Sequence, residues 1–286
     1  MPIARALSFH WFDDALPASQ SADHFLTLCS DCEHLGFDSV YVPVVDDLSR
    51  ALQLALLAAP ENPRLKFRIG GNFEHILSSL TGRDLVDASQ VLGSRLVVHM
   101  SFCEGAPEPD LNERRKFAAA AEFLVNCCNL FPAQQAPQFD IQGESSQAAI
   151  LAIKHADCLW RRAQIPRQVH ADALPVLHFG KQTGLVFDII TRTSQQDALD
   201  SLQHLMPDLD VTSLPATAAG IITHHPNRPP VLVGSFSHVA RMLSEFNAAG
   251  ISHCMIGSLG RWDEAAIFAE HVLPLIRSTT PQRQVA

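Results

Sequence analysis

The sequence predicts one α/β domain over residues 1–286, folded as a (β/α)8 barrel. Runs with the two-residue alternation of a β-strand are followed, eight times, by segments with helical periodicity. The chain has 286 residues, 47% of them hydrophobic and 18% charged, which suits one large domain with a sizeable core. An open doubly wound sheet usually has fewer strands, so we favour the closed barrel.

The elements follow one another in simple alternation. Alternating or continuous apolar residues predict strands at 7–12, 39–44, 65–70, 95–101, 138–142, 157–160, 185–192 and 253–257. Apolar residues at helical spacing predict helices at 22–35, 80–92, 112–130, 195–205, 237–249 and 263–276, together with one that ends near 59 and one that begins at Ser145.

Two segments do not fit this alternation. Residues 206–230 are rich in Pro, Thr and Ala and have little amphipathic period, so we expect a lid or an active-site excursion there. Residues 161–169 follow the sixth strand and are expected to form an active-site loop.

Composition excludes several classes of function. The net charge is −9, and no cluster of Lys and Arg is interleaved with aromatic residues, so nucleic acid is not expected as a partner. The longest apolar run, residues 51–59, is too short to span a membrane, and the N-terminus does not resemble a signal peptide. We therefore expect a cytoplasmic protein whose seven cysteines are reduced. Cys29 and Cys32 lie in mid-helix, where a structural role is expected.

Active sites of such barrels lie at the C-terminal ends of the strands. Candidates at these positions are His10, Asn72, His99, Ser101, Trp160 and Arg162. They include no paired carboxylates, which argues against a glycosidase or an enolase-type site. The H-x-H ligands of hydrolytic barrels are also missing, so no metal is expected. His10 and His99 have the alternative role of hydrogen-bonding core residues.

The turn after the fifth strand, Gly143-Glu144-Ser145-Ser146, opens an alanine-rich helix. A helix N-terminus offers unpaired N–H groups and about half a positive charge, so the turn could bind a phosphate without a lysine. A plain serine N-cap is the alternative.

Several stretches resemble the luciferase-like family of flavin-dependent monooxygenases, and most closely its alkanesulfonate monooxygenase branch. They are HLGFDSVYVP (34–43), GESSQAAILAIKHAD (143–157), LVGSFSHVARMLSEFNAAGISHCMIG (232–257) and FAEHVLPLIR (268–277). The resemblance extends from about His10 to Arg277.

This resemblance implies a barrel that binds FMN as FMNH2, forms a flavin peroxide with O2 and oxygenates a small substrate. It implies that Ser145 and Ser146 bind the phosphate, that His10 is catalytic and faces the flavin, and that further cofactor contacts come from Gly143, Glu144, Asn72, His99, Ser101 and Trp160. No G-x-G-x-x-G fingerprint occurs, so a separate flavin reductase is expected. A homodimer is expected by analogy.

The sequence departs from the family pattern at several positions. Phe117 and Ala119 replace a Tyr and an Arg, Arg162 stands at a Trp position, and Val186 and Asp188 stand at the Arg and His of the sulfonate site. Arg114, Arg115, Lys116 or Arg162 could supply the missing cation. A sulfonate needs such a cation, so an alkanesulfonate is not the expected substrate.

Substrate or lid contacts are assigned to Arg162, Asp188, His224, His225 and Arg228. Two alternatives to the monooxygenase stay open. One is a catalytically degenerate partner subunit or binding protein, and the other is a deazaflavin-dependent oxidoreductase.

Overall fold

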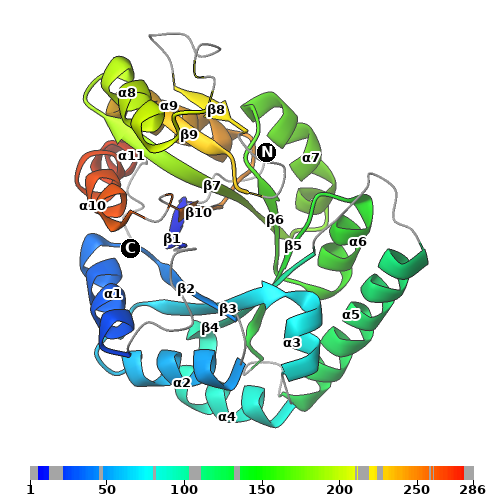
Figure 1. The fold of residues 1–286 in the computed structure, drawn as a ribbon. Helices are drawn as coiled ribbons and strands as arrows, with labels where there is room; N and C mark the ends of the chain where they lie inside the picture. Colours follow the sequence, from blue (N-terminus) through cyan, green and yellow to red (C-terminus); the bar gives the residue numbers. More distant parts are fainter. Residues whose placement is uncertain are drawn as a thin grey trace, which may run out of the picture.

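The chain forms a closed barrel of parallel strands surrounded by helices (Figure 1), as the sequence predicts. The computed structural model describes residues 6–12, 22–44, 48–79, 82–102, 111–131, 136–209, 211, 219–223, 228–257, 259 and 261–279. None of the helices in these ranges combines the length and hydropathy needed to cross a bilayer.

The strands are β1 (Ser8–Trp11), β2 (Ser39–Pro43), β3 (Lys66–Asn72), β4 (Leu96–Ser101), β5 (Gln138–Gln142), β6 (Cys158–Arg162), β7 (Gln182–Arg192), β8 (Gly220–Ile222), β9 (Val231–Ser235) and β10 (His253–Gly257). The α-helices are α1 (Ala22–Leu35), α2 (Leu48–Ala58), α3 (Phe73–Ser79), α4 (Gly82–Leu92), α5 (Leu111–Leu130), α6 (Ser146–His155), α7 (Pro166–His178), α8 (Gln195–Leu205), α9 (Phe236–Ala248), α10 (Trp262–His271) and α11 (Leu273–Thr279). A short 3₁₀ helix, Gly93–Arg95, precedes β4.

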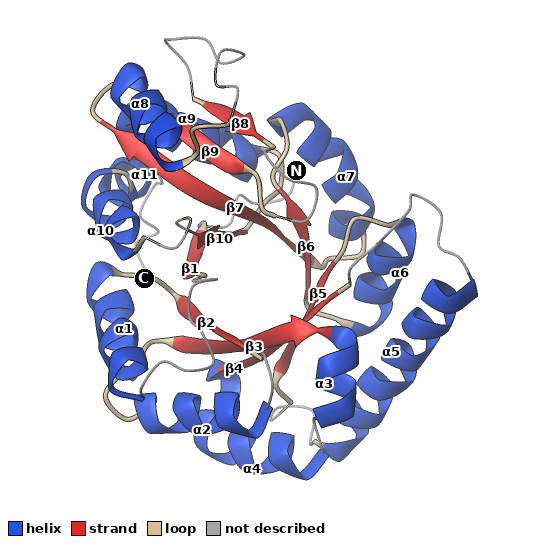
Figure 2. Cartoon of the chain, viewed as in Figure 1, coloured by secondary structure: helices blue, strands red, loops and turns tan. Residues whose placement is uncertain are grey.

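The ring closes through the long strand β7, which has two partners. Its first half pairs with β10, from Gly184 against His253 to Asp188 against Gly257. Its second half pairs with β9, from Asp188 against Val231 to Arg192 against Ser235. Strand β8 then pairs antiparallel with β9. Strands β1–β7 and β10 therefore form the barrel, and β9 and β8 extend the sheet beyond it (Figure 2).

The structure corrects three points of the prediction. Strand β9 was not predicted, because the run VLVGS is short and follows two prolines. The expected loop at 161–169 is wrong in its second half, because Pro166 begins α7, a position that proline favours. An additional helix, α3, follows β3 directly.

Side chains alternate between the two faces of each barrel strand. The outward set, including Phe67, Val98, Ile141 and Phe187, forms one apolar core with the surrounding helices. The inward set fills the lumen and is unusually polar.

The strand registers place the inward side chains in layers of four, taken from alternate strands. The middle layer holds His10, Arg68, Asp140 and Gly184. The next layer toward the C-terminal ends holds Tyr41, His99, Trp160 and Met255. The layer above that, which forms the floor of the barrel mouth, holds Phe12, Gly70, Gln142 and Val186.

Candidate functional site

Four predicted site residues lie at the C-terminal mouth of the barrel. Asn72, Ser101 and Arg162 end their strands and are half-buried, while Asp188 lies at the centre of β7 and is only 2% exposed. Their positions above the floor layer follow from the strand registers. The Oδ1 atom of Asn72 accepts a hydrogen bond of 2.9 Å from the backbone N–H of Glu74, which ties it to the start of α3.

His10 lies deeper, in the middle layer. Its Nδ1 shares a 2.8 Å hydrogen bond with Ser39 Oγ, and its Nε2 shares one of 2.9 Å with Nδ1 of His253. His253 continues the chain to Gln182 Oε1 at 3.0 Å, toward the N-terminal end of the barrel. Burial and the nearby Arg68 guanidinium hold the pKa of His10 well below its ordinary value, so the ring is neutral.

His99 and Trp160 share the layer above His10. Their rings meet edge to face, with centroids 5.9 Å apart. His99 Nε2 lies 2.8 Å from Gln142 Oε1 in the floor layer. Burial, and then repulsion from Arg68, lowers the pKa of His99 to about 3. All three predicted residues of the lumen therefore lie beneath the mouth, within packed layers.

A buried ion pair lies within the middle layer and contacts the layer above through Trp160. Arg68 and Asp140 are in contact and are 3% and 1% exposed. The indole N–H of Trp160 donates to Asp140 Oδ2 at 2.7 Å, and the Arg68 guanidinium lies over the Trp160 ring at 4.7 Å from its centroid. This cluster fixes the indole at the centre of the barrel.

The β5–α6 turn has the geometry expected of a helix start. The N–H of Gly143 donates to the carbonyl of Trp160 at 3.1 Å. Ser145 is the N-cap of α6, and its Oγ accepts from the N–H of Ala148 at 3.2 Å. The serine-cap interpretation is therefore confirmed for Ser145. The side chain of Ser146 is exposed at the first turn.

Glu144 is tied to β6. Its Oε1 accepts from the N–H of Arg162 at 2.8 Å, and its carbonyl accepts from Arg161 Nη1 at 2.7 Å. Arg161 therefore brings a guanidinium to this turn. The sequence places Arg161 in the loop expected at 161–169 but assigns it no contact, although its position at a strand end beside Arg162 was a signal.

Phe117, which stands where the family pattern has a Tyr, takes part in an aromatic stack. Its ring stacks on Phe102 with centroids 4.7 Å apart, and Phe102 stacks on Phe73 at 5.2 Å. This apolar stack occupies the ends of β3 and β4. Of the other candidate cations, Lys116 pairs with Glu74 at 2.9 Å, and Arg114 and Arg115 are exposed.

Asp188 is enclosed by β10 and the residues that follow it. Its Oδ1 lies 3.4 Å from the N–H of Leu259, a residue with a φ of +53° that non-glycine residues rarely adopt. A side chain at Gly257 would collide with the Asp188 carboxylate. The backbone here is shaped to admit a buried acid at the mouth.

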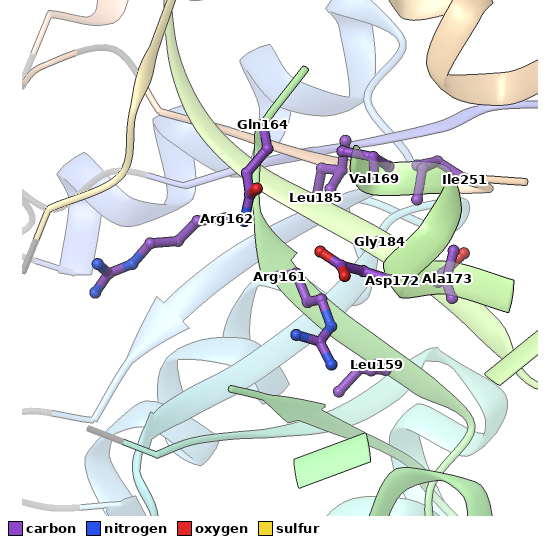
Figure 3. A pocket seen from close by; sticks show the side chains of 11 residues that line it. Leu159, Arg161, Arg162, Gln164, Val169, Asp172, Ala173, Gly184, Leu185 and Ile251 are labelled. Carbon is purple, nitrogen blue, oxygen red and sulfur yellow. The ribbon is translucent and has the colours of Figure 1, made fainter. Parts of the chain in front are cut away.

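A pocket lies outside the barrel, between β6, β7 and α7 (Figure 3). It is lined by Leu159, Arg161, Arg162, Gln164, Val169, Asp172, Ala173, Thr183, Gly184, Leu185 and Ile251. Figure 3 shows Arg162 extending away from Arg161 and α7. The pocket has room for little more than a water molecule, so it is too small for a cofactor.

The predicted lid is described only in part. His224 and His225 lie outside the described residues, and Arg228 is exposed. Within 206–230 the described residues are 206–209, 211, 219–223 and 228–230, and they include strand β8.

Arg68 and Asp140 were also missed. Each is a charged residue in the middle of an apolar strand, in KFRIG and QFDIQ. The two-residue alternation of each strand places both side chains inside the barrel. Because burying a single charge is costly, two inward charges of opposite sign could have been expected to pair.

No protein-family model matches the chain. Among solved structures, a riboflavin lyase (RcaE) with modified FMN and riboflavin has a TM-score of 0.74 at 12% identity, covering 96% of this chain and 92% of that one. A long-chain alkane monooxygenase (LadA) has a TM-score of 0.68 at 12% identity, covering 97% and 92%. An F420-dependent secondary alcohol dehydrogenase has a TM-score of 0.62 at 14% identity, covering 96% and 99%.

These similarities extend over nearly the whole length of each pair of chains. At identities of 12–14% they define the fold, a (β/α)8 barrel, and leave the family and the reaction to be argued from the site.

Proposed function

We propose that this protein is an FMNH2-dependent monooxygenase that acts on a small organic substrate and receives FMNH2 from a separate flavin reductase. The observation that carries the proposal is the β5–α6 turn at the C-terminal end of a luciferase-like barrel, where the exposed Ser146 meets a helix N-terminus. Two structures of this fold have names that include FMN or a monooxygenase activity, which supports the choice of cofactor.

The residues present fit a flavin in two respects. The α6 N-terminus offers N–H donors, Ser146 adds a hydroxyl, and Arg161 offsets the negative charge of Glu144 beside them. The floor of the mouth carries Phe12, whose partly exposed ring offers apolar surface to an aromatic ring system and is supported by the cluster that contains the buried Val186.

Bound FMNH2 would supply the electrons, so that FMNH2, O2 and substrate give FMN, oxygenated product and water. The protein's part is to hold the flavin phosphate, to exclude water and to orient the substrate. We assign substrate contacts to Asp188 and Arg162 at the rim, and further contacts to His224, His225 and Arg228 in the lid segment. Asn72 and Ser101 complete the rim near the cofactor.

The inner residues have a supporting role in this proposal. His10, which the family resemblance made catalytic, has hydrogen bonds at both ring nitrogens, so its contribution passes through Trp160, which its ring meets at 5.4 Å. His99 holds Gln142 of the floor layer in place, and Trp160 is itself held by Asp140 of the middle layer.

Anaerobic titration with FMNH2 and with oxidised FMN tests the proposal. We expect micromolar binding of FMNH2 that a Ser146→Ala variant weakens and that an Arg161→Met variant weakens further. An Arg167→Met variant, on the exposed face of α7, is the control and should bind normally. Absence of binding to both flavins would contradict the proposal.

A deazaflavin-dependent oxidoreductase is the second candidate, because an F420-dependent enzyme shares the fold over nearly its full length. Titration with F420 beside FMNH2 separates the two. Failure of all three to bind would favour a catalytically degenerate partner subunit.

A further inference from the structure

A second strand–turn–helix junction occurs at the C-terminal face, where β9 leads into α9. Its sequence is Gly234-Ser235-Phe236-Ser237-His238. Helix α9 has 13 residues, and its N-cap, Ser235, makes no side-chain capping hydrogen bond. The Ser235 hydroxyl instead lies 3.0 Å from His238 Nδ1. The first N–H groups of α9 have no intrahelical partner, so this junction lacks the cap that Ser145 gives to α6.

Unpartnered polar side chains accompany this helix start. Gln195 is 4% exposed, and neither its amide oxygen nor its amide nitrogen has a hydrogen-bond partner within the described ranges. The hydroxyl of Thr191, which is fully buried, also has no partner there. A buried polar group without a partner destabilises the folded chain, which makes these two residues candidates for contact with a ligand.

The two features lie together. A Cβ built on Gly234 would be 3.0 Å from Gln195 Oε1 and 2.8 Å from Ala219, so glycine is needed for this approach. Thr191 is the register partner of Gly234 on the neighbouring strand. The unpartnered amide of Gln195 and the hydroxyl of Thr191 therefore lie next to the residue that precedes the N-cap of α9.

We propose that this junction binds a phosphoryl group, through the α9 N-terminus, Ser237 and Gln195. All of these donors are neutral groups. Arg192, the register partner of Ser235, is held by Glu264 in two hydrogen bonds of 2.8 and 2.6 Å, so its charge is already compensated. A tetrahedral anion with several acceptor oxygens suits such a set of N–H and O–H donors around a helix start. In barrels of this type, the loops after the last strands and a nearby helix N-terminus frequently bind phosphate. The proposal does not depend on the flavin chemistry.

Inorganic phosphate is the probe, measured against the full chain by calorimetry and by ³¹P line broadening. We expect saturable binding that Ser237→Asp weakens about tenfold or more, because the new carboxylate competes for the same helix N–H groups. An acid in the first turn favours the helix, so this variant should keep or raise its melting temperature. Gln168→Asp, at an exposed position in the first turn of α7, is the matched control and should leave phosphate binding unchanged. Phosphate held at the α6 turn would instead be lost in Ser146→Asp.

Gln195→Met gives a second, independent test. Removing the unpartnered amide should weaken phosphate binding about tenfold, the loss of one hydrogen bond to a charged group, while the protein becomes no less stable. A residue with only a structural role would show the opposite pattern. No saturable phosphate binding, or a loss confined to Ser146→Asp, would overturn the proposal.

Competition then identifies the source of the phosphoryl group. Displacement of phosphate by FMN but not by riboflavin would assign the junction to the tail of the cofactor. No displacement by either flavin would assign it to a different phosphate monoester. Both results uphold the site. Phosphate binding at the α9 junction and FMNH2 binding are measured separately, so one proposal can fail while the other holds.

Discussion

At the scale of single residues, the barrel lumen depends on one compensated charge. Arg68 is 3% exposed, and Asp140 is the carboxylate in contact with it. Removing one member of a buried pair leaves the other charge unpaired, whereas replacing both with apolar residues removes the desolvation cost as well.

We therefore expect Asp140→Asn to lower the free energy of unfolding by about 3–5 kcal/mol. The double variant Arg68→Met, Asp140→Leu should recover most of this loss, with a remaining cost because the buried Trp160 indole N–H loses its acceptor. Urea unfolding followed by circular dichroism measures both. Equal losses in the single and double variants would contradict this account.

The position of the Trp160 indole requires a glycine at 184 on the neighbouring strand. A Cβ on Gly184 would lie 2.5 Å from the indole ring, so Gly184→Ala should destabilise the protein by about 1–3 kcal/mol. In a Trp160→Leu background the same change should cost less, because the clash is gone. A double-mutant cycle measures this coupling, and purely additive effects would show that the indole is not the obstacle.

Residue identity explains why the rim of the site was easier to predict than its floor. Asn72, Ser101 and Arg162 were assigned to the rim from their positions at strand ends, and Asp188 was assigned from the family resemblance. Arg68 and Asp140 were missed because a charged residue in mid-strand conflicts with the usual apolar filling of a barrel. Only their mutual contact makes that position tolerable, and single-sequence periodicity contains no information about contacts between strands.

At the scale of elements, β7 was predicted but its double partnership was not. The mostly apolar run at 185–192 predicts a buried strand, but it does not indicate which strand pairs with each half. The register switches at Asp188, which pairs with both Gly257 and Val231. The buried Asp188 carboxylate therefore lies at the point where β7 changes its partner from β10 to β9.

The α6 turn separates a structural serine from one that is free to bind a ligand. Because Ser145 Oγ caps α6, Ser145→Ala should lower the free energy of unfolding by about 1 kcal/mol. Ser146 is exposed, so Ser146→Ala should change stability by less than about 0.5 kcal/mol. Chemical denaturation of both variants checks this difference. Equal losses would mean that Ser146 also stabilises the start of α6, so that weaker flavin binding by Ser146→Ala could not be assigned to a lost contact.

At the scale of the whole molecule, the buried histidines make stability depend on pH. Burial and the Arg68 charge hold the pKa values of His10 and His99 below the ordinary 6.5, with His99 at about 3. Between these values the unfolded chain binds protons that the folded chain does not. Stability therefore rises with pH through this window and is lost as the pH falls below about 6.5.

The expected slope is about 1.4 kcal/mol per pH unit for each histidine, or about twice that for the pair. Urea midpoints measured between about pH 6.5 and 5, above the range where most carboxylates titrate, isolate this contribution. His99→Asn should remove about half of the slope, whereas His178→Asn on the exposed end of α7 should not change it. A slope unaffected by His99→Asn would mean that His99 binds its proton equally well in the folded and unfolded chains, and would leave His10 or groups outside the lumen as the source of the acid sensitivity.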